Sequence, residues 1–223
     1  MLNVGVKDLV VTHGVYPAVV NSTFELEGKY FSLLTGSNGS GKTTLLKSIC
    51  GLSQIQRGSI ALKNEDVNLA SNDYRLFRQH CAYVGHSLNF MRHIKVLEHL
   101  LLCKKFDAKN KNQNYIMDIE TALEAFDLSN KSQVKVENLS AGQQRRLGLA
   151  SAFVRSSPLI CIDEPHSSLD KQSKDKFDDL VKKQFDLGRN FIIATHESER
   201  LKEVATHEIV MLNGQAKIKE QVG

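Results

Sequence analysis

Apolar and polar side chains alternate along the first 35 residues, as in the stretch VGVKDLVV at positions 4–11. Such alternation is typical of strands that bury one face, so we expect several strands here, the last over 30–35. A strand pair is expected at the end of the chain. Short apolar runs between these regions predict further strands at 58–62, 81–85, 157–163 and 190–195. The run at 157–163 is of the kind that parallel neighbours bury on both faces.

Apolar residues recur at helical spacing between the predicted strands. We expect helices over 41–50, 94–106, 115–128, 142–155 and 171–187, and a short one near 198–204. The polar stretch at 107–114 predicts an exposed loop. Strands that alternate with helices indicate an α/β fold. The length of 223 residues suits one domain, over 1–223, or one core with a smaller lobe.

Composition narrows the class of protein without naming a function. The chain is 41% hydrophobic and 24% charged, and its net charge of 29 − 25 = +4 fits anionic ligands but does not argue for nucleic acid. No apolar stretch reaches the roughly 18 residues that span a bilayer, so we expect a soluble protein that reaches membranes through a partner. The four cysteines form no C-x-x-C pair and are predicted to be reduced, buried thiols; they are Cys50, Cys81, Cys103 and Cys161.

The stretch GSNGSGKT matches the phosphate-loop pattern G-x-x-x-x-G-K-[ST] after a predicted strand and before a predicted helix. Glycines let successive N–H groups turn toward phosphate oxygens, and the helix N-terminus adds a favourable dipole. Lys42 would bridge the β- and γ-phosphates, and the Thr43 hydroxyl would hold Mg²⁺. The candidate nucleotide-binding residues are Gly36, Ser37, Asn38, Gly39, Ser40, Gly41, Lys42, Thr43 and Thr44.

Two strand ends carry candidate catalytic groups. The strand LICIDE ends in Asp163, which can hold Mg²⁺ through water, and Glu164, which can orient and deprotonate an attacking water. The alternative is a strand followed by an acidic helix cap. His196 follows the apolar strand FIIAT, at the edge where parallel sheets bind ligands. Its alternative is a surface histidine.

The stretch LSAGQQRR at 139–146 precedes a predicted helix and forms a second candidate anion-binding helix start. One nucleotide needs a single phosphate loop, so a second such start suggests a nucleotide held between two chains. The alternative is an ordinary capped helix that contains a glycine. The residues concerned are Leu139, Ser140, Ala141, Gly142 and Gln143.

In order, GSNGSGKT, LSAGQQRR, LICIDEP, SSLD and TH resemble the motifs of the nucleotide-binding subunit of ABC transporters, over essentially the whole chain. The resemblance implies an α/β phosphate-loop core, an antiparallel β lobe from the N-terminus and a helical signature lobe around 90–156. It implies a homodimer packed head to tail, integral membrane transporter subunits as partners, and ATP with Mg²⁺ at the site. The signature 139–143 of one chain would then close on the ATP bound by the other chain.

The resemblance also assigns roles to single residues. It implies that Glu164 is the general base and that His196 contacts the γ-phosphate and the attacking water. Lys42 belongs to the same catalytic set, and Asp170, in SSLD, helps to link the two chains. The aromatic group that stacks on adenine is left open between His13 and Tyr16.

The stretch AYVGHSLNF places His86 where most ABC subunits have a glutamine that senses Mg²⁺ and water. Imidazole is a poorer partner for Mg²⁺ than an amide oxygen, but it binds water or phosphate and can change charge near neutral pH. His86 is therefore a further candidate for nucleotide and metal binding. Together with GSNGxGKT and LSAGQQRR, it resembles the ATPase subunit of the haem exporter of cytochrome c maturation.

That resemblance implies ATP hydrolysis that releases a haem-loaded chaperone from membrane partners. The subunit would lie on the cytoplasmic face of the inner membrane or the matrix face of an organelle. The alternative is the ATPase of an exporter for lipid, drug or peptide. DNA-repair and chromosome-organising ATPases insert a long coiled coil between phosphate loop and signature, whereas here the gap is 139 − 42 = 97 residues without heptads.

Overall fold

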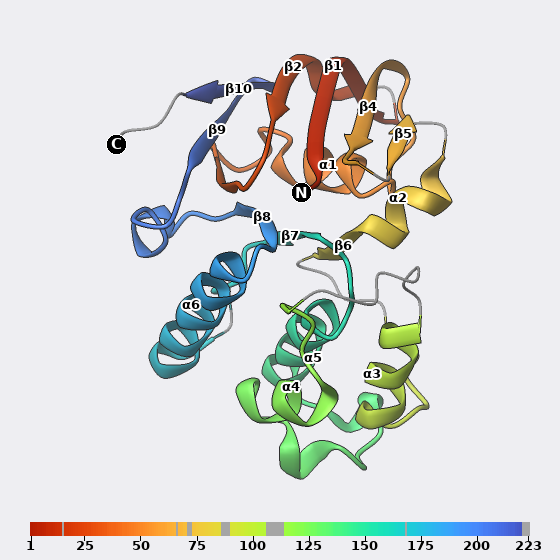
Figure 1. Ribbon diagram of the computed structural model, residues 1–223, viewed down its shortest axis with the longest axis vertical. Coiled ribbons are helices and arrows are strands. Elements are labelled where there is room, and N and C mark those ends of the chain that lie inside the picture. The colour runs from red at the N-terminus through yellow and green to blue at the C-terminus, as the bar shows by residue number, and fades with distance from the viewer. Residues whose placement is uncertain are drawn as a thin grey trace.

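The computed structural model describes residues 1–14, 16–65, 67–70, 73–85, 90–105, 114–167 and 169–219. Its first sheet has four strands in the order β2-β1-β4-β5 (Figure 1). All neighbours in this sheet are antiparallel. The strands are β1 (Asn3–His13), β2 (Tyr16–Leu26), β4 (Arg57–Lys63) and β5 (Asn68–Ala70).

The second sheet has six strands in the order β10-β9-β3-β8-β7-β6, and only β10 runs antiparallel to its neighbour. Every residue of β7 and β8 is buried, which explains their unbroken apolar runs. Because β3, β8 and β7 pair in parallel, their carboxyl ends meet at one edge of the sheet. The strands are β3 (Phe31–Thr35), β6 (Cys81–Val84), β7 (Leu159–Asp163), β8 (Asn190–Ala194), β9 (His207–Leu212) and β10 (Gln215–Lys219).

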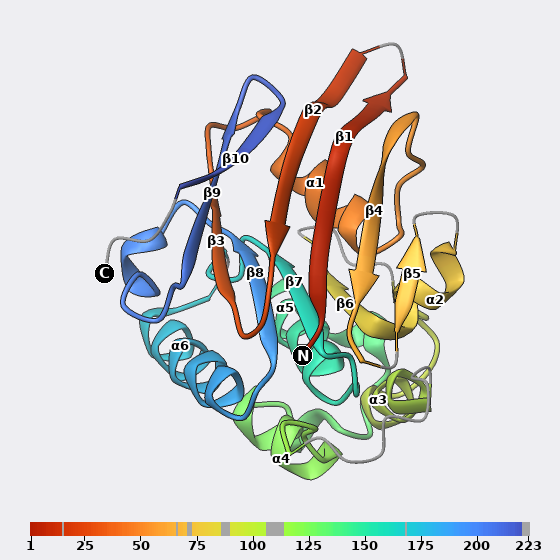
Figure 2. The same ribbon diagram turned by 45° about the horizontal axis from the view of Figure 1, so that its top comes forward.

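Helix α1 lies between the two sheets, whereas α3, α4 and α5 gather at the opposite end of the molecule from the antiparallel sheet (Figures 1 and 2). Leu45, Leu46 and Ile49 of α1 share one apolar core with β1, β4, β8 and β9. A second core joins α3, α4, α5 and α6 to the other face of the parallel sheet. The helices are α1 (Lys42–Ile49), α2 (Tyr74–His80), α3 (Val96–Lys105), α4 (Ile119–Ala125), α5 (Ala141–Phe153) and α6 (Lys171–Asp186).

Three details of the chain differ from the sequence prediction. Helix α4 is shorter than the predicted 115–128, because the Asp118 carboxylate accepts a hydrogen bond from the Thr121 N–H at 2.9 Å and caps the helix there. The expected helix at 198–204 is only a 3₁₀ turn over Ser198–Arg200. The strand β5 and the helix α2 were not predicted. Of the loop predicted at 107–114, all but residue 114 lies outside the described residues.

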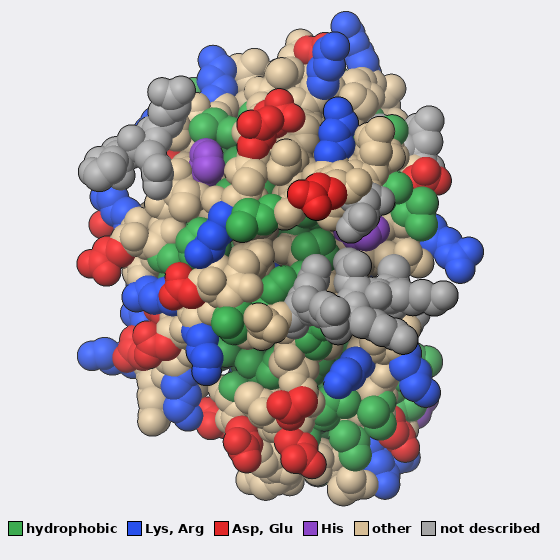
Figure 3. Space-filling model, viewed as in Figure 1, with side chains coloured by type: hydrophobic (Ala, Val, Ile, Leu, Met, Phe, Trp, Pro, Cys, Tyr) green, Lys and Arg blue, Asp and Glu red, His purple; other side chains and the backbone are tan. Residues whose placement is uncertain are grey.

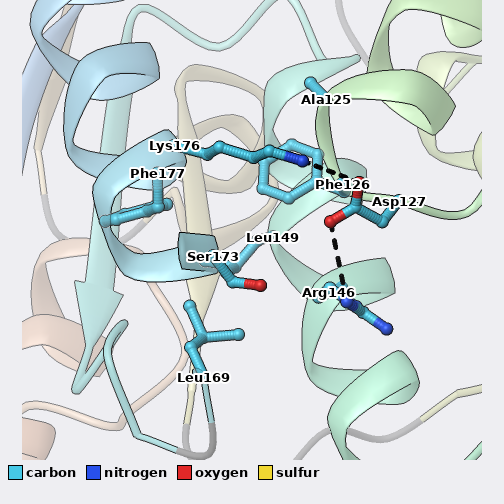
Figure 4. A pocket seen from close by; sticks show the side chains of 9 residues that line it. All are labelled: Ala125, Phe126, Asp127, Arg146, Leu149, Leu169, Ser173, Lys176 and Phe177. Carbon is cyan, nitrogen blue, oxygen red and sulfur yellow. Dashed lines mark hydrogen bonds and ion pairs between the residues drawn. The ribbon is translucent and has the colours of Figure 1, made fainter. Parts of the chain in front are cut away.

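An ion-pair cluster connects α6 to the helical end of the molecule (Figure 4). The Asp127 carboxylate lies 2.9 Å from Lys176 Nζ on α6 and 3.7 Å from Arg146 Nη1 on α5. The neighbouring pocket, between these groups and Phe177, has a volume of only about 10 Å³. It is therefore too small for a ligand and serves packing.

The cysteines are all free thiols, as predicted, but they are not all buried. Cys50, Cys81 and Cys161 are buried in the core beneath α1. Cys103 is half-buried on α3, which corrects the prediction for that residue. Burial raises the pKa of the Cys161 thiol and makes it a poor nucleophile. Within the described part of the chain, no helix has the length and apolar character that crossing a bilayer requires.

Candidate functional site

The loop between β3 and α1 curves through positions where only glycine fits. Gly41 has φ +106°, and a Cβ atom there would lie 2.2 Å from the carbonyl oxygen of Ala18. Gly36 has φ +146°, and its Cβ would lie 2.5 Å from the Met211 carbonyl oxygen. The main chains of β2 and β9 lie so close to the loop that a side chain at Gly41 or Gly36 would clash with them. Glycine avoids this clash and also adopts the positive φ angles that the tight loop requires.

Lys42 starts α1 and turns its side chain back into this loop. Its ammonium donates hydrogen bonds to the carbonyls of Gly36, at 2.7 Å, and Ser37, at 3.0 Å. The N-cap residue Gly41 provides no side-chain acceptor for the first turn of α1. An uncapped helix start next to a buried cation is a site that suits an anion such as phosphate.

The end of β7 brings a carboxylate to the start of α1. The Thr43 hydroxyl donates a hydrogen bond to Asp163 Oδ2 at 2.5 Å. Asp163 is only 4% exposed, so its charge is held in a sheltered position. Hydroxyl and carboxylate oxygens are ligands that Mg²⁺ prefers, and this pair fits such an ion.

Glu164 and His196 leave neighbouring strands and meet above the phosphate loop. Glu164 has φ +51°, and its N–H donates to the Ala194 carbonyl at 2.8 Å. His196 Nε2 lies 3.4 Å from Glu164 Oε1 and 2.7 Å from Asn38 Oδ1. The pairing of β7 with β8 thus places the Glu164 carboxylate beside the His196 imidazole, and the Asn38 amide of the phosphate loop contacts the same imidazole.

These groups line an open cavity of about 660 Å³, a volume that suits a nucleotide. The described lining residues are Ala18, Asn38, Gly39, Ser40, Gly41, Lys42, Thr43, Thr44, Asp163, Glu164, Ser167 and His196. None of them belongs to the stretch 139–143. The second candidate helix start therefore lies away from this cavity within the same chain.

The start of α5 is closed by its own side chains. Ser140 Oγ accepts a hydrogen bond from the Gln143 N–H at 3.3 Å, and Gln143 Oε1 accepts from the Ser140 N–H at 3.0 Å. This reciprocal pair is a capping box. Ser140 and Ala141 are exposed, Gly142 and Gln143 are half-buried, and Leu139 packs into the core.

The start of α6 carries Asp170, an exposed residue. Its carboxylate accepts a hydrogen bond from the Ser173 N–H at 2.8 Å, which lowers the pKa of Asp170. Asp170 is thus an N-cap within its own chain.

Besides the stretch 139–143 and Asp170, five predicted residues are not placed in the cavity. Gly36 and Ser37 are absent from its described lining, although their carbonyls accept hydrogen bonds from Lys42. His86 lies outside the described residues, as does the side chain of His13. Tyr16 is 81% exposed at the start of β2, two positions before Ala18, which does line the cavity. The choice of the adenine contact stays a prediction.

Three residues contact the site without having been assigned a role from the sequence. Ala18 covers Gly41, and the Ser167 hydroxyl donates to the Glu164 carbonyl at 2.8 Å. Arg145, within LSAGQQRR, donates to the carbonyls of Asp163 and Glu164. Each of these contacts depends on a main-chain carbonyl, which every residue type has, so no sequence pattern indicates them.

Comparison with known proteins confirms the family and the fold. A family model described as ABC transporter matches residues 19–167. A protein of Roseobacter denitrificans called cytochrome c biogenesis ATP-binding export protein CcmA is 34% identical over 195 residues, which cover 87% of this chain and 84% of that protein. The protein of the same name from Brucella abortus strain 2308 is 37% identical over 164 residues, 74% of this chain and 71% of that one.

Solved structures agree on the fold. The ATP-binding subunit of an ABC transporter superposes with a TM-score of 0.84 at 23% identity, over 97% of this chain and 89% of that one. A dimeric ATP-binding cassette in a post-hydrolysis state, bound to ADP and Pi, gives a TM-score of 0.83 at 22% identity, over 99% of both chains.

Proposed function

Because the chain belongs to the ABC transporter family, as an ATP-binding subunit that hydrolyses ATP, we propose that it drives the haem exporter of cytochrome c maturation. The observation that carries this proposal is the 34% identity to a cytochrome c biogenesis export protein across 84% of that protein. Hydrolysis would release a haem-loaded chaperone from the membrane partners of the subunit.

The phosphate loop 36–44 would bind the phosphates of ATP. The Lys42 ammonium, held 2.7 Å from the Gly36 carbonyl, would bridge the β- and γ-phosphates. The Thr43 hydroxyl, 2.5 Å from Asp163 Oδ2, would hold Mg²⁺, and Asp163 would hold the ion through water. His86 would complete the site where related subunits have a glutamine. The ion would neutralise charge on the phosphates.

Glu164 would act as general base, because its carboxylate faces the cavity that the phosphate loop lines. The carboxylate would orient the attacking water and take its proton. His196, 3.4 Å from Glu164 Oε1, would contact both that water and the γ-phosphate. Asn38 Oδ1 lies 2.7 Å from the same ring nitrogen, Nε2, and helps to orient the imidazole.

A homodimer would complete the site. The stretch 139–143 is absent from the described lining of the chain's own cavity, and Ser140 at its start is exposed. We infer that it closes on the ATP of a second copy, packed head to tail. Asp170, exposed at the start of α6, would help to link the two chains.

Integral membrane subunits would dock on the helical end of the molecule. Exposed apolar side chains there include Met91, 61% exposed, and Leu101, 43% exposed on α3. Figure 3 shows hydrophobic side chains on this part of the surface, among lysines, arginines and acids. Docking would place the chain on the cytoplasmic face of the inner membrane, or on the matrix face of an organelle.

The Glu164→Gln variant tests this proposal in cells. It keeps the shape of the side chain and removes the base, so ATP should stay bound and the complex should stall. We expect tagged Glu164→Gln to co-purify with membrane subunits and with a chaperone that carries haem, seen as haem absorbance in the purified complex. Mature c-type cytochromes should fall in the same cells.

The exposed Glu203 provides a matched control, since Glu203→Gln removes the same charge on the surface away from the described cavity lining. This variant should leave cytochrome levels unchanged. If Glu164→Gln traps membrane subunits that carry lipid, drug or peptide instead of haem, and c-type cytochromes mature normally, the haem assignment is wrong.

A further inference from the structure

Arg145 is a buried arginine whose two terminal nitrogens, Nη1 and Nη2, donate to the main chain of the catalytic edge, while its buried Nε has no hydrogen-bond partner among the described residues. Its Nη1 donates to the Gly85 carbonyl at 2.5 Å, and its Nη2 donates to the carbonyls of Asp163, at 2.7 Å, and Glu164, at 2.6 Å. Arg145 itself is only 4% exposed. Its planar fork therefore joins three fixed points with little freedom to move.

Those three carbonyls belong to the ends of two neighbouring strands. Val84 of β6 pairs with Ile162 of β7, and Gly85 and Asp163 are the next residues of each strand. Glu164, the proposed base, follows directly in the left-handed conformation. The guanidinium thus holds two segments in place: the turn that orients Glu164, and Gly85, the last described residue before 86–89.

Arg145 itself lies on the helix that starts with the signature stretch. Helix α5 runs over Ala141–Phe153, and Ser140 caps it. Arg145 lies within the first turns, close to the end that we propose acts on the partner's ATP. Arg145 follows the N-cap Ser140 by five residues on one hydrogen-bonded helix, so we expect it to move together with the helix start.

No carboxylate side chain within the described residues forms an ion pair with Arg145. Burial lowers the pKa of Arg145, while the nearby carboxylates of Asp163 and Glu164 act in the opposite direction. A buried cation whose hydrogen bonds go to carbonyls is expensive to desolvate. A leucine or methionine would fill the space between α5 and the sheet more simply.

We propose that Arg145 is a positioning residue that couples the two ATP sites of the dimer. Closure of the signature stretch on the partner's ATP moves the start of α5, and Arg145 transmits this movement to the main chain of Asp163 and Glu164. The base of one site thus reaches its working position when the other site is occupied. This inference rests on the proposed two-chain site.

The test compares Arg145→Met with Arg146→Met in the complete chain, with ATP turnover measured against ATP concentration. Methionine keeps an unbranched, flexible stem, although a shorter one, and has no hydrogen-bond donors. Arg146 is the matched control, since it is on the same helix but contacts Asp127, at 3.7 Å, rather than the catalytic edge. Both variants lose one positive charge.

We expect Arg145→Met to lower kcat by about 10- to 100-fold, the loss that a misplacement of about 1 Å produces. The KM for ATP should change by less than about threefold, because no phosphate contact is lost. The Hill coefficient for ATP, above one in the wild type, should fall to about one. Arg146→Met should keep the wild-type kcat and Hill coefficient.

The outcomes separate this inference from the proposed function. If wild-type turnover is not cooperative and Glu164→Gln forms no ATP-dependent dimer, the two-chain site is wrong. If the wild type is cooperative and Arg145→Met keeps both its kcat and its Hill coefficient, the role of Arg145 is wrong. An equal loss of kcat in Arg146→Met also contradicts it.

Arg145→Lys covers the case in which the methionine variant does not fold, judged by thermal melting and by binding of a fluorescent ATP analogue. Lysine keeps the charge but cannot reach three carbonyls with a fixed fork. We expect Arg145→Lys to bind the analogue normally and to have a kcat between those of the wild type and Arg145→Met. If the kcat of Arg145→Met cannot be measured, the kcat of Arg145→Lys should still be below that of the wild type. Full kcat with full cooperativity in Arg145→Lys would overturn the proposal.

Discussion

Two helices of this molecule begin at a candidate phosphate site, and the two beginnings are built in opposite ways. Helix α1 starts behind Gly41 with no side-chain cap, and Lys42 folds back beside the opening. Helix α5 starts behind Ser140 with a complete capping box, in which Ser140 and Gln143 satisfy each other. The first start is open toward an anion, whereas the second has used its own polar groups.

This difference supports the proposal that the start of α1 binds ATP within one chain and that the start of α5 acts only on a partner's ATP. The open start of α1 faces a cavity of about 660 Å³ together with Asp163, Glu164 and His196. The closed start of α5 is outside that cavity's described lining. A ligand at α5 has to compete with the capping box, so we expect binding there only when a second chain presents ATP already held by its own loop.

The largest expected effect comes from removing the cation at the open start. Lys42→Ala deletes the ammonium that would stabilise the transferring phosphoryl group, so turnover should fall by at least about 100-fold. Binding of a fluorescent ATP analogue should weaken in the same variant, measured by titration. Unchanged binding and turnover, in a variant that melts like the wild type, would contradict the assignment of the phosphate loop.

A second, smaller effect tests the shape of the open start. Gly41→Ala puts a methyl group 2.2 Å from the Ala18 carbonyl at φ +106°, so the loop has to move. We expect ATP affinity to fall by about tenfold or more, equivalent to about 1.4 kcal/mol. In the control Gly39→Ala, at φ +78° with no atom within 4 Å of the new Cβ, the loss should be distinctly smaller. Equal losses would mean that contact with β2 does not shape the site.

A third effect should appear only in the paired molecule. Ser140→Ala opens the capping box and should lower the free energy of unfolding by about 1 kcal/mol, measured by chemical denaturation. ATP affinity of the single chain should not change, but turnover should fall because Ser140 is the residue that we propose faces the partner's ATP. If Ser140→Ala weakens ATP binding by the single chain, the start of α5 takes part in that binding, and the proposed difference between the two helix starts is wrong.

Asp118 provides the control for this third effect, because it caps α4 in the same manner, with its carboxylate 2.9 Å from the Thr121 N–H. Asp118→Ala should also lower stability, because α4 loses its N-cap. Its turnover should match the wild type. A fall in turnover equal to that of Ser140→Ala would assign the effect to stability alone.

The smallest expected effect concerns His86, the residue that we propose completes the ATP site at the start of α1. His86→Gln restores the residue that most ABC subunits have, so turnover at neutral pH should stay within about threefold of the wild type. Only neutral imidazole has a free acceptor nitrogen, so wild-type activity should fall more than the variant's as pH drops toward about 6. Identical pH profiles and identical coupling to the membrane subunits would make His86 an ordinary residue at a strand end.

The sequence predicts those parts of the fold that repeat a pattern over enough residues. The strands β7 and β8 are identified by apolar runs that burial on both faces requires. The strand β5 has three residues and α2 has seven, which is too short for periodicity to be recognised. Helix α4 was predicted too long because its start depends on the cap at Asp118 rather than on apolar spacing.

The candidate site also has a part that the sequence predicts and a part that only the folded structure shows. Lys42, Thr43, Asp163 and Glu164 belong to motifs, and the structure brings all four to one cavity. The contact of Asn38 with His196 joins positions 158 residues apart, so only the folded sheet creates it. Arg145 stands inside a quoted motif, yet its partners are main-chain carbonyls that no motif encodes.

Glu164 has a left-handed backbone, at φ +51°. At this position the residue that is best for stability differs from the residue that is needed for activity. A residue with a Cβ costs roughly 1–2 kcal/mol in this conformation, whereas glycine adopts it freely. Glu164→Gly should therefore be neutral or stabilising while it removes the proposed base. Any search for more heat-resistant versions of this chain that scores melting temperature alone would accept that change and yield a well-folded, inactive protein.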